Sequence, residues 1–227
     1  MYSGGGLVQR IYDCSDSTEL LTGMRQAKLA IGRGELIVLP TDTVYGIGAD
    51  AFNPKAVQAL LDAKGRGRST PPPVLIGDSS ALDALAVDVP DVARALVEQF
   101  WPGPLTLVLH AQPSLTWDLG ETKGTVGLRT PDSKEAIALL QETGPMAVSS
   151  ANLHGKPSAT NAQQAYEYFG ENVPVYLDAG EARAGVASTI LDLTNWESKT
   201  IRVLRQGALE LSDINKYAEG FDFESVS

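Results

Sequence analysis

The chain has 227 residues, of which 43% are hydrophobic and 20% charged, and its formal net charge is −10. This length allows one large domain or two small ones with an adequate core. The acidic balance argues against broad non-specific binding to DNA or RNA, which depends on surplus Lys and Arg, and no apolar run approaches the roughly 20 residues needed to span a bilayer.

The N-terminus carries neither the basic segment nor the apolar stretch of a signal peptide, since it reads Met-Tyr-Ser-Gly-Gly-Gly. Cys14 is the only cysteine, so no internal disulfide can form, which fits a reducing compartment. We therefore expect a cytoplasmic protein that makes no membrane contact.

The first predicted helix begins at Asp16 or Ser17, either of which can cap it, and ends at Ile31. Its buried face is expected to comprise Leu20, Leu21, Met24, Ala27 and Ile31. Residues 36–39 form a short apolar run typical of a buried strand. Pro40 should end that strand, because proline cannot donate to a sheet ladder.

Polar residues follow this strand in quick succession. Thr41, Asp42 and Thr43 come directly after Pro40, and two glycines beyond them, at positions 46 and 48, give the backbone unusual freedom. Hydroxyls and a carboxylate at the carboxyl end of a buried strand lie where open α/β sheets usually bind ligands. The alternative is a polar turn made flexible by its glycines.

A second helix is expected to begin at Asn53-Pro54, where a capping side chain precedes a proline at the first helical position. It should end at Lys64-Gly-Arg-Gly-Arg68, which carries three positive charges in five residues. A flexible loop of this kind can wrap a polyphosphate, with Lys as a point charge and Arg as a bidentate fork. The alternative is a basic turn that faces water.

Short strands and helices interleave along the rest of the chain. Strands are expected at residues 73–77, 105–110, 125–129, 145–148, 173–177, 188–193 and 201–204. Helices are expected at residues 78–97, with a break at Pro90, and at 133–142, 161–169 and 208–217. Residues 111–123 should form an irregular loop. This pattern favours a single α/β or mixed α+β domain over residues 1–217, followed by a frayed acidic tail over 218–227.

Polar clusters repeatedly follow these strands. They comprise Thr41, residues 64–68, Arg129, residues 149–152 and residues 188–189. Arg129 stands at the end of a strand, next to other strand ends, where an arginine is well placed to grip an anion. One shared crevice is the economical explanation for all of these clusters.

Seven sequence blocks within the chain occur in a characteristic order: Leu39-Pro-Thr-Asp-Thr-Val-Tyr-Gly46, Lys64-Gly-Arg66, Trp101-Pro-Gly-Pro-Leu-Thr106, Gly127-Leu-Arg129, Ser149-Ser-Ala-Asn152, Ser188-Thr-Ile190 and Arg205-Gln-Gly207. Together they resemble the YrdC/TsaC family, the threonylcarbamoyl-adenylate (threonylcarbamoyl-AMP) synthases, in the short single-domain form. The resemblance covers roughly residues 11–217.

The resemblance implies a twisted mixed sheet with flanking helices and a concave, positively lined cavity. It also implies a reaction in which L-threonine, bicarbonate or CO2, and ATP give threonylcarbamoyl-AMP and pyrophosphate. That product would feed N6-threonylcarbamoyladenosine formation at tRNA position 37 through a separate transferase complex. Mg2+ would accompany ATP, and no protein metal site is implied.

The same resemblance implies roles for individual residues. Lys64 and Arg66 would act as catalytic residues that hold the phosphates. Further ATP contacts would come from Thr70, Thr125, Asn152, Thr160 and Arg205. L-Threonine contacts would come from Thr41, Arg129, Ser150 and Ser188, with Arg129 a natural partner for the substrate carboxylate. The residues indicate no general base.

The sequence departs from the family pattern after the Lys-x-Arg block. Many members carry an Asn and a His there, and the corresponding positions here are Thr70 and Leu75. A threonine can replace an amide as a hydrogen-bond partner, but a leucine cannot replace an imidazole. Arg68 is an additional cation that could move phosphate binding along the loop.

The main alternative function is a non-catalytic module of the same fold that binds double-stranded RNA by its backbone. The net charge of −10 counts against it, although a weak RNA contact remains compatible with a local basic pocket. A serine hydrolase would use Ser149 or Ser150 with His110 or His154, but neither serine lies in a Gly-x-Ser-x-Gly turn. A carbamoyl-transfer domain of the hydrogenase-maturation type would need acylphosphatase and zinc-finger regions that this sequence lacks.

Overall fold

The computed structural model describes residues 10–226, so the N-terminal segment considered above and Ser227 lie outside it. Its strands are β1 (Ile11–Asp13), β2 (Ile37–Leu39), β3 (Gly46–Asp50), β4 (Val74–Leu75), β5 (Ala86–Val87), β6 (Leu105–Ala111), β7 (Thr125–Arg129), β8 (Met146–Ser150), β9 (Val175–Asp178), β10 (Thr189–Asp192), β11 (Thr200–Arg205) and β12 (Asp222–Ser225). Its α-helices are α1 (Ser17–Gly32), α2 (Pro54–Lys64), α3 (Leu82–Leu85), α4 (Asp91–Phe100), α5 (Lys134–Thr143), α6 (Ala162–Phe169) and α7 (Leu211–Ile214).

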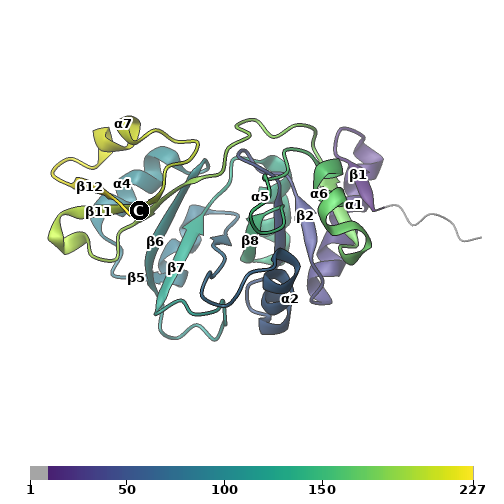
Figure 1. The fold of residues 1–227 in the computed structure, drawn as a ribbon, viewed down its shortest axis with the longest axis horizontal. Coiled ribbons are helices and arrows are strands. Elements are labelled where there is room, and N and C mark those ends of the chain that lie inside the picture. The colour runs from purple at the N-terminus through teal and green to yellow at the C-terminus, as the bar shows by residue number, and fades with distance from the viewer. Residues whose placement is uncertain (1–9, 227) are drawn as a thin grey trace, which may run out of the picture.

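All of these strands join one mixed sheet. The strand order is β1-β9-β2-β3-β8-β4-β7-β6-β10-β11-β12, and β5 pairs with β6 off this path. Figure 1 shows one end of the sheet, with β2 and β8, in one half of the molecule and the other end, with β6, β11 and β12, in the opposite half. The predicted mixed α/β class with a twisted sheet and flanking helices is confirmed.

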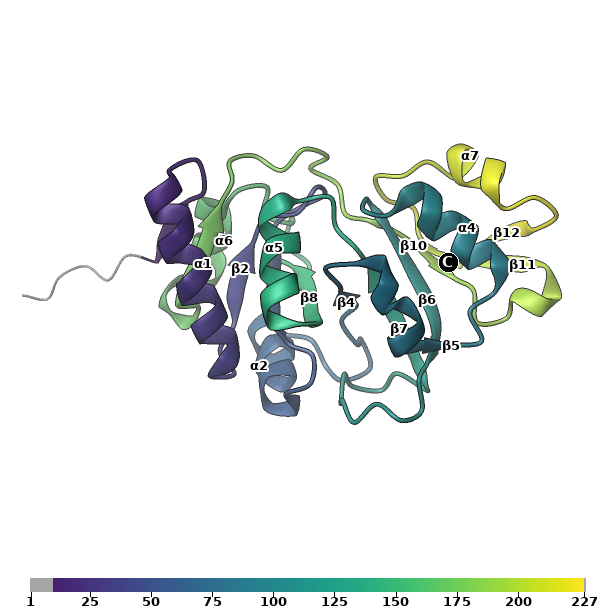
Figure 2. The same ribbon diagram turned by 180° about the vertical axis from the view of Figure 1, so that it is seen from behind.

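Different helices cover the two faces of the half that holds β2. Because successive side chains of a strand point to opposite faces, Ile37 and Leu39 share a buried cluster with α1 and α5, whereas Val38 shares one with α2 and α6. Figure 2 shows α1 and α5 together on the near face. This double cover explains why β2 reads as a continuous apolar run.

Three of the predicted helices begin directly after a residue whose side chain caps them. The Asp16 carboxylate accepts hydrogen bonds from the backbone N–H groups of Thr18 and Glu19, each at 2.9 Å. Asn53 caps α2 and Asn161 caps α6 in the same way. Capping involves residues that are close in the sequence, so the starts of these helices can be predicted from the sequence.

The buried face of α1 differs from the prediction at Leu21, which is 73% exposed. Gly23 is buried in its place, and an added Cβ there would lie 2.7 Å from the Cβ of Tyr12 and 2.9 Å from a methyl group of Leu177. The glycine lets α1 approach the sheet so closely that its contact face turns away from Leu21.

The two glycines expected in a flexible turn lie instead inside the sheet, in β3, between β2 and β8. An added Cβ at Gly46 would lie 2.5 Å from Cγ1 of Val148, and one at Gly48 would lie 2.7 Å from Cε of Met146. Side chains of β8 therefore pack directly over the backbone of β3, and the glycines serve close packing rather than flexibility.

Besides β3, three short strands were not predicted from the sequence. β1 pairs in parallel with β9, and β5, which replaces part of the helix expected at 78–97, pairs with β6. The expectation of a frayed tail is wrong at Asp222–Ser225, where β12 pairs in parallel with β11. These strands are held by backbone pairing with distant residues, which leaves no periodic pattern in their own sequence.

The β6–β7 and β9–β10 connections contain neither helix nor strand, and the second runs from one half of the molecule to the other. The loop of residues 112–124 is irregular, as predicted. Residues 179–187, called the strap here, run from β9 towards β10 and arc across the top of Figure 1. The strap is fixed by the Tyr45 hydroxyl, which donates to the carbonyl oxygen of Gly180 at 2.7 Å, and by the N–H of Gly185, which donates to the carbonyl oxygen of Thr43 at 2.9 Å. Over residues 10–226, no helix has the length and apolarity needed to cross a bilayer.

Candidate active site

A cavity of about 300 Å³ forms where the predicted polar clusters converge. Its walls come from β3, β4, β6, β7, β8, β10 and β11, and from the segments that follow β2, follow α2 and precede β10. Seven of the predicted site residues line it: Thr41, Arg66, Thr70, Arg129, Ser150, Ser188 and Arg205. The shared crevice expected from the sequence therefore exists.

Lys64 and Asn152 lie behind this wall and support it. Lys64 is 1% exposed, and its Nζ donates to the carbonyl oxygens of Ser150 and Asn152 and, at 2.8 Å, to Oδ1 of Asn152. The Ser150 hydroxyl donates to the same Oδ1 at 2.6 Å. Burial, with a smaller contribution from Arg66, lowers the pKa of Lys64 to about 7. Lys64 thus fastens the turn after β8 to the end of α2.

Two other predicted ATP contacts also lie outside the cavity. Thr125 lines an adjoining hollow of about 280 Å³ whose walls are largely apolar and which shares Thr70 with the cavity. Thr160 lies near the N-terminus of α6, where its N–H and hydroxyl donate to Oε1 of Gln164. Like Lys64 and Asn152, Thr160 lines neither hollow.

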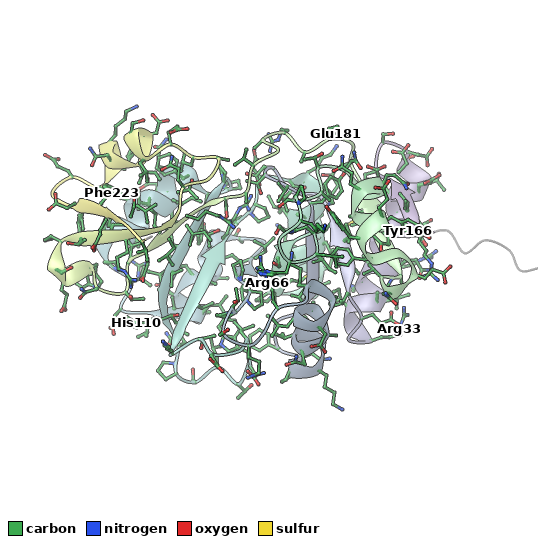
Figure 3. All side chains as sticks on the ribbon, viewed as in Figure 1. Arg33, Arg66, His110, Tyr166, Glu181 and Phe223 are labelled. Carbon is green, nitrogen blue, oxygen red and sulfur yellow. The ribbon has the colours of Figure 1, made fainter. Side chains whose placement is uncertain are left out.

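Of the three arginines in the cavity, Arg66 has the weakest side-chain hydrogen bonding to the rest of the protein. Its Nε is buried without a hydrogen-bond partner, and its Nη1 reaches the hydroxyl of Ser149 only at 3.4 Å. Figure 3 shows Arg66 near the centre of the molecule, between the two halves. Buried N–H groups without acceptors are unfavourable, so this guanidinium is poised for an external anion.

Arg68, two residues further on, has a different role from the one that its charge suggests. It forms a surface ion pair with Asp118 at 2.6 Å, and its carbonyl oxygen accepts from the N–H of Glu121 at 2.8 Å. Arg68 therefore ties the loop after α2 to the loop of residues 112–124 and does not line the cavity.

Arg129 is held firmly at the end of β7. Its Nε donates to the carbonyl oxygen of Gly103 at 2.9 Å, its Nη1 to the hydroxyl of Thr43 at 3.0 Å, and its Nη2 to the carboxylate of Asp42 at 2.5 Å. Burial lowers the pKa of Arg129, and the Asp42 carboxylate opposes that shift. The Trp-Pro-Gly-Pro turn thus contributes the carbonyl group of Gly103 to the site.

Arg205 and Ser188 form the opposite side of the cavity. The Nε of Arg205 donates to the Ser188 carbonyl oxygen at 2.8 Å, and its Nη2 donates to the Ser188 hydroxyl at 3.0 Å. That hydroxyl is also hydrogen-bonded to the hydroxyl of Thr106 at 2.8 Å. Ser188 is consequently fixed between a charged donor and a neighbouring strand.

The cavity is strongly electropositive inside an acidic protein. Its described lining contains three arginines and no carboxylate, and the adjacent Asp42 offsets only one of these charges. Burial lowers the pKa of Arg205, and the charges of Arg129 and Arg66 lower it further. Like charges held this close favour binding of an anion with more than one negative charge.

A larger hollow of about 660 Å³ lies on the other side of Thr41 and Tyr45. Its lining includes two cations, Lys134 and Arg183, and five carboxylates: Asp13, Asp132, Glu135, Asp178 and Glu181. Volume alone would favour this hollow, but its charge repels phosphates and carboxylates. The smaller cavity is the better anion site.

Among the described residues, neither histidine is hydrogen-bonded to the serines at positions 149 and 150. His110 Nε2 lies 3.0 Å from the carbonyl oxygen of Thr194, and Figure 3 shows His110 well away from Arg66. Neither His110 nor His154 lines the cavity. The arrangement required for a serine hydrolase is therefore not present in the described residues.

Sequence reasoning missed Asp42, Thr43 and Gly103 as the groups that hold Arg129. Their blocks were visible in the sequence, but Asp42 and Arg129 are 87 positions apart. Only the fold shows that the carboxylate faces the guanidinium and not a ligand.

The comparisons with known proteins show which family the chain belongs to. The family model Sua5_yciO_yrdC, described as "Telomere recombination", matches residues 29–207. A putative threonylcarbamoyl-AMP synthase from Mycobacterium tuberculosis (strain H37Rv) is 51% identical over 203 residues, which cover 89% of this chain and 92% of the relative. The threonylcarbamoyl-AMP synthase of Pyrococcus abyssi is 40% identical over 187 residues, 82% of this chain and 54% of that protein.

A solved structure of P. abyssi Sua5 complexed with L-threonine superposes with a TM-score of 0.86 and 36% identity, over 95% of this chain and 62% of that one. The chain thus spans nearly the whole mycobacterial relative but less than two thirds of the archaeal protein. On the family match and the sequence identities, this chain belongs to the Sua5/YciO/YrdC family.

Proposed function

We propose that the protein is an L-threonylcarbamoyladenylate synthase, which converts L-threonine, bicarbonate or CO2, and ATP into threonylcarbamoyl-AMP and pyrophosphate. The observation that carries this proposal is the cavity itself, where three arginines meet only one compensating carboxylate in a protein of net charge −10. Relatives of 51% and 40% identity with this activity in their names support it.

The phosphate side of the reaction falls to Arg66 and Arg205. A carbamate oxygen attacks the α-phosphorus of ATP, a new P–O bond forms, and the bond to the β-phosphate oxygen breaks to release pyrophosphate. The negative charge of the phosphates must be neutralised throughout the reaction. The N–H groups of Arg66 that have no partner in the protein are therefore the donors best able to bind the phosphates. Lys64 would join them only by exchanging its bonds to the Ser150 and Asn152 oxygens.

The remaining contacts to ATP and L-threonine are assigned from where each residue lies. We assign Thr70 and Thr125 to the nucleoside portion of ATP, because both line the adjoining apolar hollow. Asn152 and Thr160 complete the proposed ATP set. Thr41, Arg129, Ser150 and Ser188 form the proposed L-threonine set, with the substrate carboxylate against Arg129.

Mg2+ fits this site as part of the substrate MgATP. The described residues hold no cluster of three or more His, Cys, Asp or Glu side chains suited to a metal, and the cavity lining has no carboxylate. Mg2+ commonly binds through substrate phosphates and water, and when bound it neutralises part of the phosphate charge. The chain's own contribution is therefore the arginines.

We place the reaction in the cytoplasm, where the lone buried thiol of Cys14 stays reduced. Threonylcarbamoyl-AMP is a reactive mixed anhydride, so a transferase complex that acts on tRNA position 37 should consume it. Any RNA contact would be weak, because the three clustered arginines lie inside a cavity of about 300 Å³ and the net charge of the chain is −10. The same point disfavours a non-catalytic RNA-binding module.

The deciding experiment measures pyrophosphate release from ATP with threonine and bicarbonate omitted in turn. The proposal requires that release depend on both. Release that persists without threonine would instead indicate an ATP pyrophosphohydrolase. Tight RNA binding with a steep salt dependence and no ATP turnover would establish the RNA-binding alternative.

A further inference from the structure

The ion pair between Asp42 and Arg129 is buried on both sides. Each side chain is 7% exposed, and Nη2 of Arg129 lies 2.5 Å from Oδ1 of Asp42. The other ion pairs within residues 10–226 all keep at least one partner 45% exposed or more. Exposed pairs contribute little, whereas removing one member of a buried pair leaves an uncompensated charge.

Only one member of the pair faces the cavity. Arg129 lines it, and Asp42 does not. Across residues 10–226, Arg129 makes three hydrogen bonds, to Gly103, Thr43 and Asp42, one from each of its nitrogens. A guanidinium has five N–H groups, so one remains on each terminal nitrogen. Those two N–H groups are what Arg129 can offer to a ligand carboxylate.

Asp42 is itself held in place from several directions. Its Oδ1 also accepts the backbone N–H of Asp132 at 3.0 Å, and its carbonyl oxygen accepts the N–H of Ala184, in the strap, at 3.1 Å. The carboxylate therefore has a fixed orientation before any ligand arrives, and it passes that orientation on to Arg129.

We infer that Asp42 is a positioning residue for the amino-acid substrate, which it never touches: it aims the Arg129 guanidinium and offsets its charge. The inference rests on the proposed function and extends it to a residue outside the cavity. Without the carboxylate, Arg129 would keep only its hydrogen bonds to Gly103 and Thr43, and it would add a third uncompensated charge to the cavity. Pre-orienting a charged donor reduces the entropy lost when the ligand binds.

The first test is Asp42→Asn, assayed by pyrophosphate release with threonine and ATP varied in turn. The KM for threonine should rise about 10- to 100-fold, which corresponds to one charge-assisted hydrogen bond, while the KM for ATP stays within about two-fold of wild type. Asp83→Asn is the matched control, because Asp83 forms an exposed pair with Arg94 at 2.7 Å, away from the cavity. It should leave both KM values unchanged.

Asp42→Glu covers the case in which the Asn variant fails to fold. It keeps the negative charge but moves the carboxylate by one methylene. If Asp42 positions Arg129, the KM for threonine should still rise; if Asp42 only compensates the charge of Arg129, the KM for threonine should not change. A double-mutant cycle completes the test: in an Arg129→Met background, Asp42→Asn should raise the KM for threonine no further, and removing both charges together should be tolerated.

The outcomes separate the two proposals. A wild-type protein without threonine-dependent pyrophosphate release would overturn the proposed function and the role of Asp42 with it. If the wild type is active, three results would overturn the role of Asp42 alone. The Asn and Glu variants could leave the KM for threonine unchanged, or they could raise the KM values for threonine and ATP equally. Alternatively, Asp42→Asn could raise the KM for threonine further in the Arg129→Met background.

Discussion

Replacing Arg66 by methionine removes the cavity guanidinium whose donors the protein leaves largely unused. A bidentate contact to phosphate comprises two charge-assisted hydrogen bonds of about 1.5–3 kcal/mol each. Their loss should lower kcat/KM for ATP by about 10²- to 10⁴-fold. The KM for threonine should change much less, because Arg129 and its partners lie on the amino-acid side.

The same substitution should leave stability intact or improve it. In the free protein the Arg66 side chain makes one long hydrogen bond, buries an unpartnered Nε and lies close enough to Lys64 and Arg205 to lower both of their pKa values. Relieving that repulsion by about 1 kcal/mol would raise the melting temperature by about 2–4 °C in a chain of this size. Loss of activity with gain of stability is characteristic of a site strained for function.

The assay is pyrophosphate release at saturating threonine and bicarbonate, with thermal unfolding measured on the same samples. Arg68→Met is the matched control: it removes an arginine from the same loop, but one that is paired with Asp118 at the surface. The control should retain activity within about three-fold, as expected for an exposed pair. An Arg66→Met enzyme as active as this control would refute the phosphate role of the cavity.

Three further predictions concern stability and reactivity. The pKa of Lys64 is lowered to about 7 in the folded protein, so between pH 7 and about 10.5 the unfolded chain binds more protons. Stability should therefore rise with pH across that window, by at most about 5 kcal/mol, in urea titrations compared with those of Lys64→Met; a flat difference would contradict this. Burial raises the pKa of the Cys14 thiol to about 12, so iodoacetamide at pH 8 should modify the folded protein about 10³-fold more slowly than the urea-unfolded chain. Gly46→Ala should destabilise by about 1–3 kcal/mol, because its methyl group would lie 2.5 Å from Val148, whereas Gly32→Ala, with open space around it, should not; equal effects would show that close packing is not the reason for Gly46.

Local chemistry was the part of the fold that the sequence predicted well. Asp16, Asn53 and Asn161 each satisfy backbone donors within three residues, so their helix starts could be read from neighbouring letters alone. β12 shows the opposite case, because its pairing with β11 depends on backbone groups that carry no residue-specific signal. An exposed acidic sequence such as Asp222–Ser225 then reads as a tail.

For the site, the sequence predicted which segments meet but not which side chains face inward. Lys64 and Arg66 are two positions apart in one block, yet Arg66 lines the cavity and Lys64 is buried behind it. The difference arises because Lys64 is the last residue of α2, whereas Arg66 follows the left-handed turn at Gly65. The orientation of these two cations depends on the turn that Gly65 makes between them and not on their own residue types.

Asp42 also explains how an acidic protein keeps one electropositive hollow usable. Three unpaired arginines close together would repel one another and stay mobile, whereas full pairing would leave nothing for a substrate anion. The cavity lies between these limits: Arg129 is paired and oriented, Arg66 has spare donors, and Arg205 is fixed by the oxygens of Ser188. This division matches a reaction with two anionic partners, since a small carboxylate requires an oriented donor, whereas a polyphosphate requires net positive charge.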